Sequence, residues 1–283
     1  MIDSGKIEGG TGLLKKIMIT VKTYPVISTK YSELVCTAGY DFEEKRLIRI
    51  FPIKYRDLPF DKQFRKYDIL QVRVVKATKD YRIDSYHLED IRDTGKIIGY
   101  ITTDNRTWKT RRKLLNPLKS TLCKLMKDHE NDNRNTPSLG FIKPIDPSFS
   151  FEKGAEDWDS KQKMMITQAN MFEDNRKRAL RKVPFVFKYK FRCEDPDCRG
   201  HTLTITDWEV YAQYLHRLDE TKNEEKALEK TQYMFGNKLV SETDLHFFVG
   251  TVYPKNSWII IGVFYPKIKY LQSLGHKSAG LFD

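Results

Sequence analysis

The sequence predicts an α+β protein with a small β-barrel-like domain in its N-terminal half and an antiparallel sheet with helices in its C-terminal half. Short segments that alternate apolar and polar residues, separated by polar turn residues, indicate strands in both halves. The chain of 283 residues also exceeds the usual size of one domain. We therefore expect a flexible lead-in over residues 1–15, a basic β-rich domain over 16–145 and an α+β domain over 146–283.

The N-terminal domain is expected to contain five strands, at residues 16–22, 34–36, 47–51, 69–75 and 96–101. Five short strands with few long helical stretches predict a small barrel or a strongly curved sheet, and both are common platforms for nucleic acid. Asn116 as N-cap and Pro117 in the first turn then predict a helix that closes this half. Leu118, Leu122 and Leu125 would lie on its apolar face.

The C-terminal domain is expected to open with a helix over residues 160–180. The clearest strand is 185–192, where large aromatic residues alternate with Val, Lys and Arg, so that one face is buried. The remaining predicted elements are a return strand at 202–206, helices at 207–218 and 223–240, and a hairpin of 245–253 with 258–265.

The net charge of +12 is unevenly distributed along the chain. Residues 1–150 contain 29 Lys and Arg against 19 Asp and Glu. This asymmetry favours a polyanionic partner, with nucleic acid, either DNA or RNA, as the expected one. The alternatives are a basic surface that only maintains solubility, and a protein partner.

The longest purely apolar run, Trp258 to Phe264, has only seven residues, so we expect no membrane partner. The four cysteines are Cys36, Cys123, Cys193 and Cys198. Their placement makes a poor disulfide framework and favours a reducing, cytoplasmic location. Cys36 is interpreted as a small core residue rather than as a nucleophile.

Residues 106–113 form the strongest nucleic-acid-binding candidate, because five basic residues surround Trp108 and no acid occurs between Asp104 and Asp128. Arg and Lys neutralise phosphates, and a Trp ring can stack on an unpaired base. The alternative is a solvated loop with Trp108 packed into the core. The predicted contact residues are Arg106, Trp108, Lys109, Arg111, Arg112, Lys113, Arg65, Lys66, Lys188 and Lys190.

Two thiols and an imidazole, from Cys193, Cys198 and His201, lie within nine residues. They could supply three of the four ligands of a tetrahedral zinc ion. The fourth ligand would be His216, His246, an acidic residue or water. The alternative is a polar turn whose cysteines are merely half-buried.

The acids after this turn allow a second function, a metal-dependent nuclease with His201, Asp207 or Glu209 near the metal. Thr206 and Glu209 also have the spacing of a capping box at the start of a helix, which is a structural explanation of the same residues. No motif in the sequence identifies a reaction. We therefore expect a non-catalytic sensor or adaptor that binds nucleic acid.

Several segments resemble a family of uncharacterised bacterial proteins over nearly the whole chain. They are ITVKTYP at 19–25, LVCTAG at 34–39, IRIFPI at 48–53, the Cys193–His201 run with Asp207-Trp208-Glu209, and FFVGT with IIIGVFYP. The resemblance implies a bacterial-type cytoplasmic protein and brings no activity with it. The strand order and basic character of the N-terminal half are also similar to PUA/ASCH-like barrels, which read RNA or modified bases.

Overall fold

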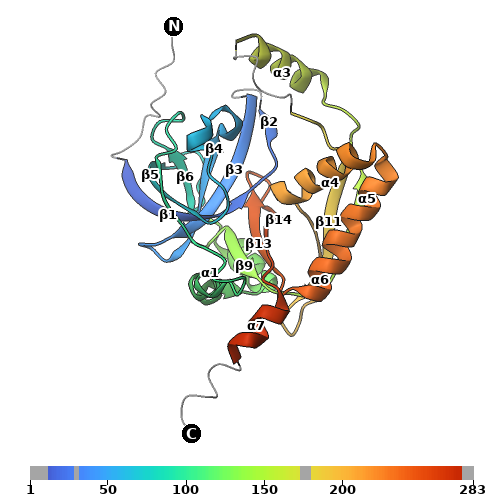
Figure 1. Ribbon diagram of the computed structural model, residues 1–283. Coiled ribbons are helices and arrows are strands. Elements are labelled where there is room, and N and C mark those ends of the chain that lie inside the picture. Colours follow the sequence, from blue (N-terminus) through green and yellow to red (C-terminus); the bar gives the residue numbers. More distant parts are fainter. Residues whose placement is uncertain (1–11, 29–31, 173–179, 276–283) are drawn as a thin grey trace. The chain divides into compact units, whose positions relative to one another are not determined.

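The computed structural model describes residues 12–28, 32–172 and 180–275 (Figure 1). The chain forms two compact units. Unit 1 comprises residues up to 100 with 133–137 and 151–186, and unit 2 comprises 101–132, 138–150 and 187 onward. The boundary expected near residue 145 falls inside strand β10 (Pro144–Lys153). No single boundary divides the units, because the chain passes from one unit to the other more than once.

Unit 1 contains a closed five-stranded barrel, which confirms the predicted fold class. The strands are β1 (Leu13–Lys22), β3 (Ser32–Asp41), β4 (Arg46–Ile53), β6 (Ser85–Leu88) and β5 (Asp68–Lys76). The sheet closes because β1 pairs with β3 on one side and with β5 on the other. Strand β7 (Lys96–Tyr100) pairs with β5, and the short β2 (Val26–Ser28) pairs with β3.

Residues 13–15 were expected in a flexible lead-in, and this is wrong because β1 begins at Leu13 and continues the ladder with β5. The rest of that lead-in, apart from Gly12, lies outside the described residues. Aliphatic side chains from all five strands fill the barrel interior, among them Ile17, Ile48 and Val74, which have no exposed surface. Two 3₁₀ turns, η1 (Tyr55–Asp57) and η2 (Phe60–Lys62), precede β5.

The remaining strands form two small sheets. The first has the order β10-β11-β12, with β11 (Phe185–Cys193) paired to β12 (His201–Thr204). The second has the order β14-β13-β9-β8, from β8 (Lys119–Ser120), β9 (Leu139–Ile142), β13 (His246–Val252) and β14 (Ser257–Phe264). On β11 the aromatic face predicted from the alternation is buried, and Phe187 and Tyr189 have no exposed surface.

Helices account for most of the rest of unit 2. They are α1 (Lys109–Leu115), the 3₁₀ turn η3 (Asn116–Leu118), α2 (Leu122–Asn131), α4 (Trp208–Thr221), α5 (Glu224–Gln232), the π-helical turn η4 (Tyr233–Lys238), α6 (Leu239–Glu242) and α7 (Ile268–Gly275). Helix α3 (Ser160–Phe172) belongs to unit 1, and the end predicted for it near residue 180 lies outside the described residues.

The predicted start of a helix at Asn116 is wrong. Asn116 and Pro117 form only the single turn η3, and the chain then adds strand β8 before α2 begins at Leu122. Thr121 is the N-cap, because its side chain accepts a hydrogen bond from the N–H of Lys124 at 3.2 Å. The cap therefore lies five residues later than the sequence indicated.

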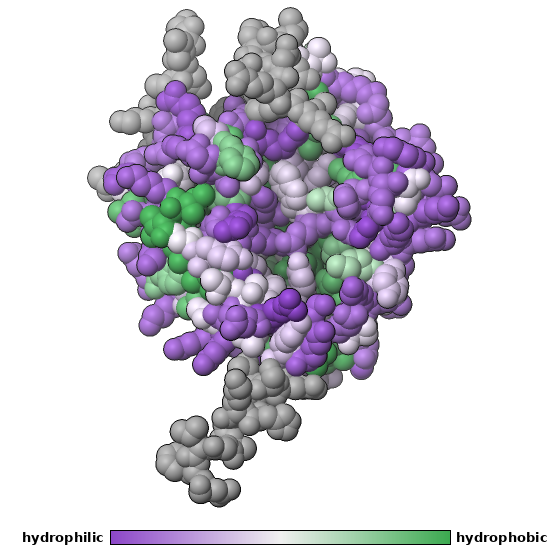
Figure 2. Space-filling view, viewed as in Figure 1, coloured by the Kyte–Doolittle hydropathy of each residue, from purple (hydrophilic) through white to green (hydrophobic). Residues whose placement is uncertain are grey.

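Hydrophilic side chains cover most of the visible face, as the large share of charged residues requires (Figure 2). Among the helices in the described part of the chain, none has the combined length and apolar character needed to cross a bilayer.

Candidate metal centre and basic surface

Four potential metal ligands meet in unit 2: Cys123, Cys193, Cys198 and His201, whose ligand atoms all lie within 4.8 Å of one another. His201 Nε2 is 3.2 Å from the Cys198 sulfur and 3.4 Å from the Cys123 sulfur, and the Cys123 and Cys193 sulfurs are 3.6 Å apart. Tetrahedral bonds of about 2.3 Å to sulfur and 2.0 Å to nitrogen would give edges of about 3.8 and 3.5 Å. These residues could therefore hold one tetrahedral metal ion.

Each ligand is placed by a different local structure. Cys193 ends β11, His201 begins β12, and Cys198 lies in the turn between them, where Gly200 adopts a φ of +100° that favours glycine. Cys123 comes from the first turn of α2. This helix packs closely on β9, because a Cβ on Gly140 would lie 2.2 Å from Leu125 Cδ1.

Contacts outside the four ligands hold α2 and the β11–β12 turn together. Lys119, just before α2, forms an ion pair with Glu194 at 2.8 Å. The N-cap residue Thr121 lies 3.5 Å from the Asp195 carboxylate. Within the turn itself, the N–H of Cys193 donates to the Cys198 sulfur at 3.3 Å and helps to fix the position of this candidate ligand.

The protonation of these side chains would change if a cation bound to them. Burial together with the neighbouring Cys193 and Cys198 raises the pKa of Cys123 to about 12. Burial opposes ionisation of Cys198 too, but N–H groups of Cys193 and Gly200 outweigh it and lower the pKa of this thiol. Burial lowers the pKa of His201, which keeps the imidazole neutral, as a ligand must be. A bound cation would compensate the three thiolates.

Sequence reasoning found three of these ligands and missed the fourth. Instead of His216, His246, an acid or water, the structure supplies Cys123, 70 residues before Cys193. His246 instead stacks on Phe141 and contacts the Asp244 carbonyl. The available signal was only that the chain has further cysteines, because three cysteines and one histidine form a common zinc ligand set.

Asp207, an expected ligand of a nuclease metal, has a structural role in this fold. It is fully buried, and its two carboxylate oxygens accept the N–H groups of Glu209 and Val263, each at 2.8 Å. Asp207 is thus the N-cap of α4, and the predicted capping box from Thr206 is wrong by one residue. Thr206 instead donates its N–H to the Ile260 carbonyl.

Helix α1 anchors the basic segment, defined here as residues 106–127. Its inner face has the helical spacing of Trp108, Arg111 and Leu115. The Arg111 side chain is only 2% exposed; its guanidinium donates to the Ile101 carbonyl at 2.7 and 3.1 Å and lies 4.6 Å from the Trp108 ring. The structure thus places Arg111 in the interior, away from any position where it could contact a phosphate.

Trp108 packs against other aromatic residues, the alternative to base stacking proposed from the sequence. Its ring makes an edge-on contact with Phe264 at 4.9 Å and a tilted contact with Tyr265 at 5.5 Å. The ring therefore supports α1 from beneath. The outer face of the same helix carries Lys109, Arg112 and Lys113, of which both lysines are exposed and Arg112 is half-buried.

The outer basic side chains lack carboxylate neighbours. Within the described residues, Lys109, Arg112, Lys113 and Lys127 form no ion pair. Asp104, the acid next to this segment, caps α1 by accepting the Thr110 N–H at 2.7 Å. The charge of the outer face is consequently not neutralised locally.

A partly exposed aromatic ring that sequence reasoning did not select lies beside the basic segment. Arg106 donates to the Tyr270 hydroxyl at 2.7 Å, and Arg106 and Lys269 lie 5.6 and 5.1 Å from the Tyr270 ring. The hydrogen bond from Arg106 lowers the pKa of Tyr270. Because 164 residues separate Arg106 from Tyr270, no local pattern could have found this pair.

The other predicted contact residues lie elsewhere. In unit 1, Arg65 is paired with Asp68 at 3.2 Å and lies over the Tyr100 ring, and Lys66 is half-buried. In unit 2, Lys188 and Lys190 alternate with the buried aromatic residues of β11, and Lys190 is exposed. Their contribution to nucleic-acid binding stays a prediction.

Two family models match the chain in consecutive pieces. Residues 14–117 match a domain of unknown function (DUF8758), and residues 118–283 match a second domain of unknown function (DUF8757). No match was found among the curated proteins. The likeness of the barrel to PUA/ASCH-like domains and the bacterial origin stay predictions. Because the second match spans more than half of the chain and contains all four candidate ligands, the chain belongs to the DUF8757 family.

Proposed function

We propose that the protein binds single-stranded nucleic acid, as a sensor or adaptor without catalytic activity, through the outer face of α1 and the neighbouring Arg106 and Tyr270. The observation that carries the proposal is the division of α1 into two faces. Trp108 and Arg111 fix the helix from the inside, while Lys109, Arg112 and Lys113 form no ion pair among the described residues. Unpaired cations on one short helix suit the neutralisation of neighbouring phosphates.

Tyr270 supplies the second requirement of a single-strand site, an aromatic surface beside the cations. Its ring is partly exposed and flanked by Arg106 and Lys269. Bases stack on such rings without a strong sequence preference, whereas bases in a duplex are already stacked. This arrangement favours single strands over double strands.

We further propose that the four-ligand cluster holds a structural zinc ion. Three thiolates and one imidazole form a closed, soft ligand set that zinc prefers, and the set leaves no position for a substrate. The ion would tie Cys123, within the basic segment, to the β11–β12 turn. Reduced cysteines of this kind fit the cytoplasmic location expected from the sequence.

Binding can be tested by fluorescence anisotropy with labelled single-stranded DNA and RNA, and with the matching duplexes, over a range of salt concentrations. The variant with Lys109, Arg112 and Lys113 all replaced by Ala should bind more weakly. Its slope of log affinity against log salt should flatten by about two units for single strands, since each lost phosphate contact removes about 0.7.

The matched control replaces three exposed lysines outside the basic segment, Lys161, Lys226 and Lys255, by Ala. This control removes the same charge and should keep most of the slope. Equal loss in both triple variants would mean that only net charge matters. No binding at low salt by the wild-type protein would overturn the proposed function.

A further inference from the structure

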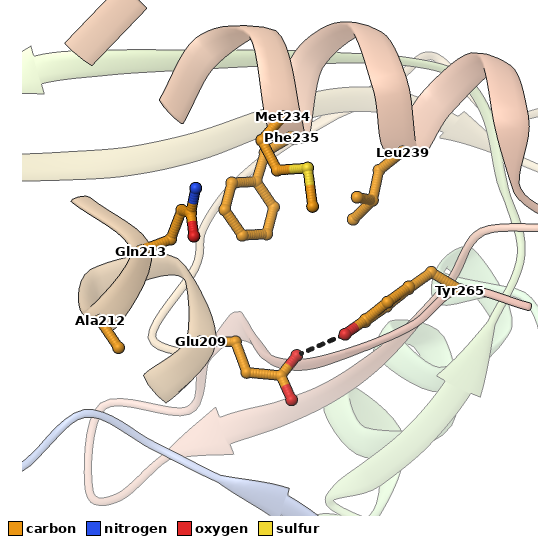
Figure 3. Close-up of a pocket in the computed structure, with 7 residues that line it drawn as sticks. All are labelled: Glu209, Ala212, Gln213, Met234, Phe235, Leu239 and Tyr265. Carbon is orange, nitrogen blue, oxygen red and sulfur yellow. Dashed lines mark hydrogen bonds between the residues drawn. The ribbon is translucent and has the colours of Figure 1, made fainter. Parts of the chain in front are cut away.

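Polar side chains inside unit 2 are hydrogen-bonded in several places. The hydroxyl of Tyr265 donates to Glu209 Oε2 at 3.2 Å, beside the cavity shown in Figure 3. The hydroxyl of Tyr189, which has no exposed surface, donates to the Phe235 carbonyl at 2.8 Å. A buried polar group without a partner costs free energy, so such bonds are the usual arrangement.

His129, near the end of α2, departs from this arrangement. The residue is only 3% exposed, and neither ring nitrogen has a hydrogen-bond partner within the described residues. The ring instead makes an edge-on contact with Trp258 of β14, and the two ring centroids are 5.8 Å apart. The imidazole thus occupies the place of an apolar ring, which its neutral form can do at a much lower cost than its charged form.

The docking of α2 depends on few residues. The buried residues of this ten-residue helix are Leu122, Leu125 and His129. Leu125 lies close to Gly140 of β9, and His129 contacts Trp258 of β14. An isolated helix of this length is only marginally stable in water, so α2 persists through its packing. A change at His129 therefore acts on one of three anchors of the helix.

The charged groups of the adjoining elements do not pair with His129. Strands β9 and β14 contain no titratable side chain, and β13 and β8 contain only His246 and Lys119. His246 contacts the Asp244 carbonyl, and Lys119 is paired with Glu194. The other titratable residues of the adjoining segments lie on α2, directly after it or in the β13–β14 turn: Cys123, Lys124, Lys127, Asp128, Glu130, Asp132, Tyr253 and Lys255. None of them shares a hydrogen bond with the imidazole.

We infer that His129 makes the docking of α2 sensitive to mild acid. Protonation in the docked helix would leave an imidazolium in the interior without an acceptor, and a buried unpaired charge is far more costly than a buried neutral ring. Once α2 leaves the sheet, water reaches the ring, and an exposed histidine takes up a proton near about pH 6.5. The undocked state therefore binds one proton more than the docked state, so a falling pH favours undocking.

Undocking has a consequence for the rest of unit 2, because α2 also carries Cys123 and Lys127. Leaving the sheet would take Cys123 away from the β11–β12 turn and Lys127 from its place in the basic segment. The sensitivity to acid itself requires neither the proposed zinc ion nor a bound nucleic acid, since it arises from the packing of His129 alone.

Hydrogen exchange followed by mass spectrometry at about pH 7.5 and 5.5, on either side of the ordinary histidine value, tests the inference. Protection factors correct for the pH dependence of exchange itself. In the wild-type protein, the protection of α2 should fall about 10-fold over this range, the shift that one proton bound near pH 6.5 produces. The barrel strands should keep their protection, because exposed carboxylates titrate at about pH 4.

His129→Phe keeps a ring against Trp258 but cannot take up a proton. Between the two pH values, its α2 protection should fall about 10-fold less than that of the wild type. His129→Leu makes the same test with a smaller apolar side chain, should the Phe variant not fold. The matched control is His216→Gln, which removes a histidine from an exposed position on α4 and should keep the wild-type response.

The comparison between wild type and the variants at position 129 decides the outcome, since protonation of the candidate metal ligands would loosen α2 in all of these proteins alike. Equal responses of the wild type and a folded variant at position 129 would overturn the inference. Unchanged α2 protection in the wild type would overturn it as well. Loss of the response in His216→Gln would do the same, because it would assign the effect to overall charge.

Discussion

The barrel and the outer face of α1 differ in how their positive charges are paired. Several arginine and lysine residues of the barrel unit form ion pairs: Lys15 with Asp41 and Glu44, Arg46 with Glu44, Arg56 with Glu33, Arg65 with Asp68, Arg73 with Glu89, Arg82 with Asp80 and Arg92 with Asp90. On the outer face of α1, Lys109, Arg112 and Lys113 have no such partners among the described residues.

This difference changes the meaning of the charge asymmetry in the sequence. The excess of positive charge in residues 1–150 suggested that the whole N-terminal half attracts a polyanion. Pairing within the barrel unit neutralises several of its cations, although Lys16, Lys45, Lys54 and Lys96 form no ion pair among the described residues. A count of charged residues therefore does not locate the unpaired cations. Net charge counts residues, whereas a phosphate responds to the cations that remain unpaired.

The strongest test of the comparison removes the metal that we propose fixes the basic segment. Chelation, or Cys198→Ser, should destabilise unit 2 by at least about 3 kcal/mol, because structural zinc contributes directly to folding. Hydrogen exchange should show lost protection in α2 and the β11–β12 turn, with protection retained in the barrel strands. Elemental analysis should find about one zinc per wild-type chain.

Cys36→Ala serves as the control for this experiment. Cys36 lies on β3 and is not part of the four-residue cluster, so its loss should leave the metal content unchanged. A purified protein that contains no metal and is as stable as a metal-loaded sample would refute the structural zinc.

A smaller effect distinguishes two adjacent arginines of α1. Arg111→Ala should lower the free energy of unfolding by about 1–3 kcal/mol, because it leaves the Ile101 carbonyl without its buried donors. Arg112→Ala should change stability by less than about 0.5 kcal/mol and weaken nucleic-acid binding instead. Denaturant titration and anisotropy on both variants measure the two properties separately. Equal effects of the two substitutions on both properties would contradict the assigned faces of α1.

The smallest expected effect concerns the loss of stability in strong acid, which should arise in the barrel. Partial burial opposes ionisation of Glu44, but hydrogen bonds from Lys15 and Arg46 outweigh it and lower the pKa of this carboxyl. Arg82 does the same for Asp80. Because the folded-state pKa values lie below the unfolded ones, this stabilisation is present above about pH 4 and is lost as the pH falls through the folded values.

Glu44→Gln should therefore flatten the acid limb of a plot of unfolding free energy against pH. Glu43→Gln, the neighbouring position, is the matched control and should leave that limb unchanged, since its side chain forms no ion pair within the described residues. The same flattening in both variants would mean that the ion pairs of Glu44 contribute nothing specific.

Local patterns in the sequence predicted the fold well. Alternation indicated β1, β3, β4 and β5 of the barrel and the aromatic face of β11, and the proline and asparagine between β13 and β14 indicated their hairpin. The barrel strand β6 was missed, and the fifth strand predicted, at 96–101, is β7, which pairs with β5 outside the ring of five strands. The strand pattern left a barrel and a curved sheet open, because neither the closing pair of β1 with β5 nor its register can be read from either strand alone. Helix starts were displaced where a second capping residue was available, as with Thr121 and Asp207.

The candidate site was less predictable because its parts come from distant segments. Three ligands share one turn and were found, but Cys123 appeared to be an ordinary residue of an apolar helix. Trp108 and Arg111 are residue types that often contact nucleic acid. Only their helical spacing relative to Leu115 indicates that they lie on the inner face of α1. The Tyr270 ring reaches Arg106 from the far end of the chain.

The separation of 70 residues between Cys123 and Cys193 gives the proposed metal a further consequence for how the chain assembles. A bond across so long a loop removes chain entropy from the unfolded state worth about 4 kcal/mol, far more than a bond within a short turn. During synthesis, the basic segment would emerge well before its partner turn. It would therefore gain its fixed geometry only after Cys193, Cys198 and His201 had been synthesised. The complete binding surface would then form only when unit 2 is nearly complete.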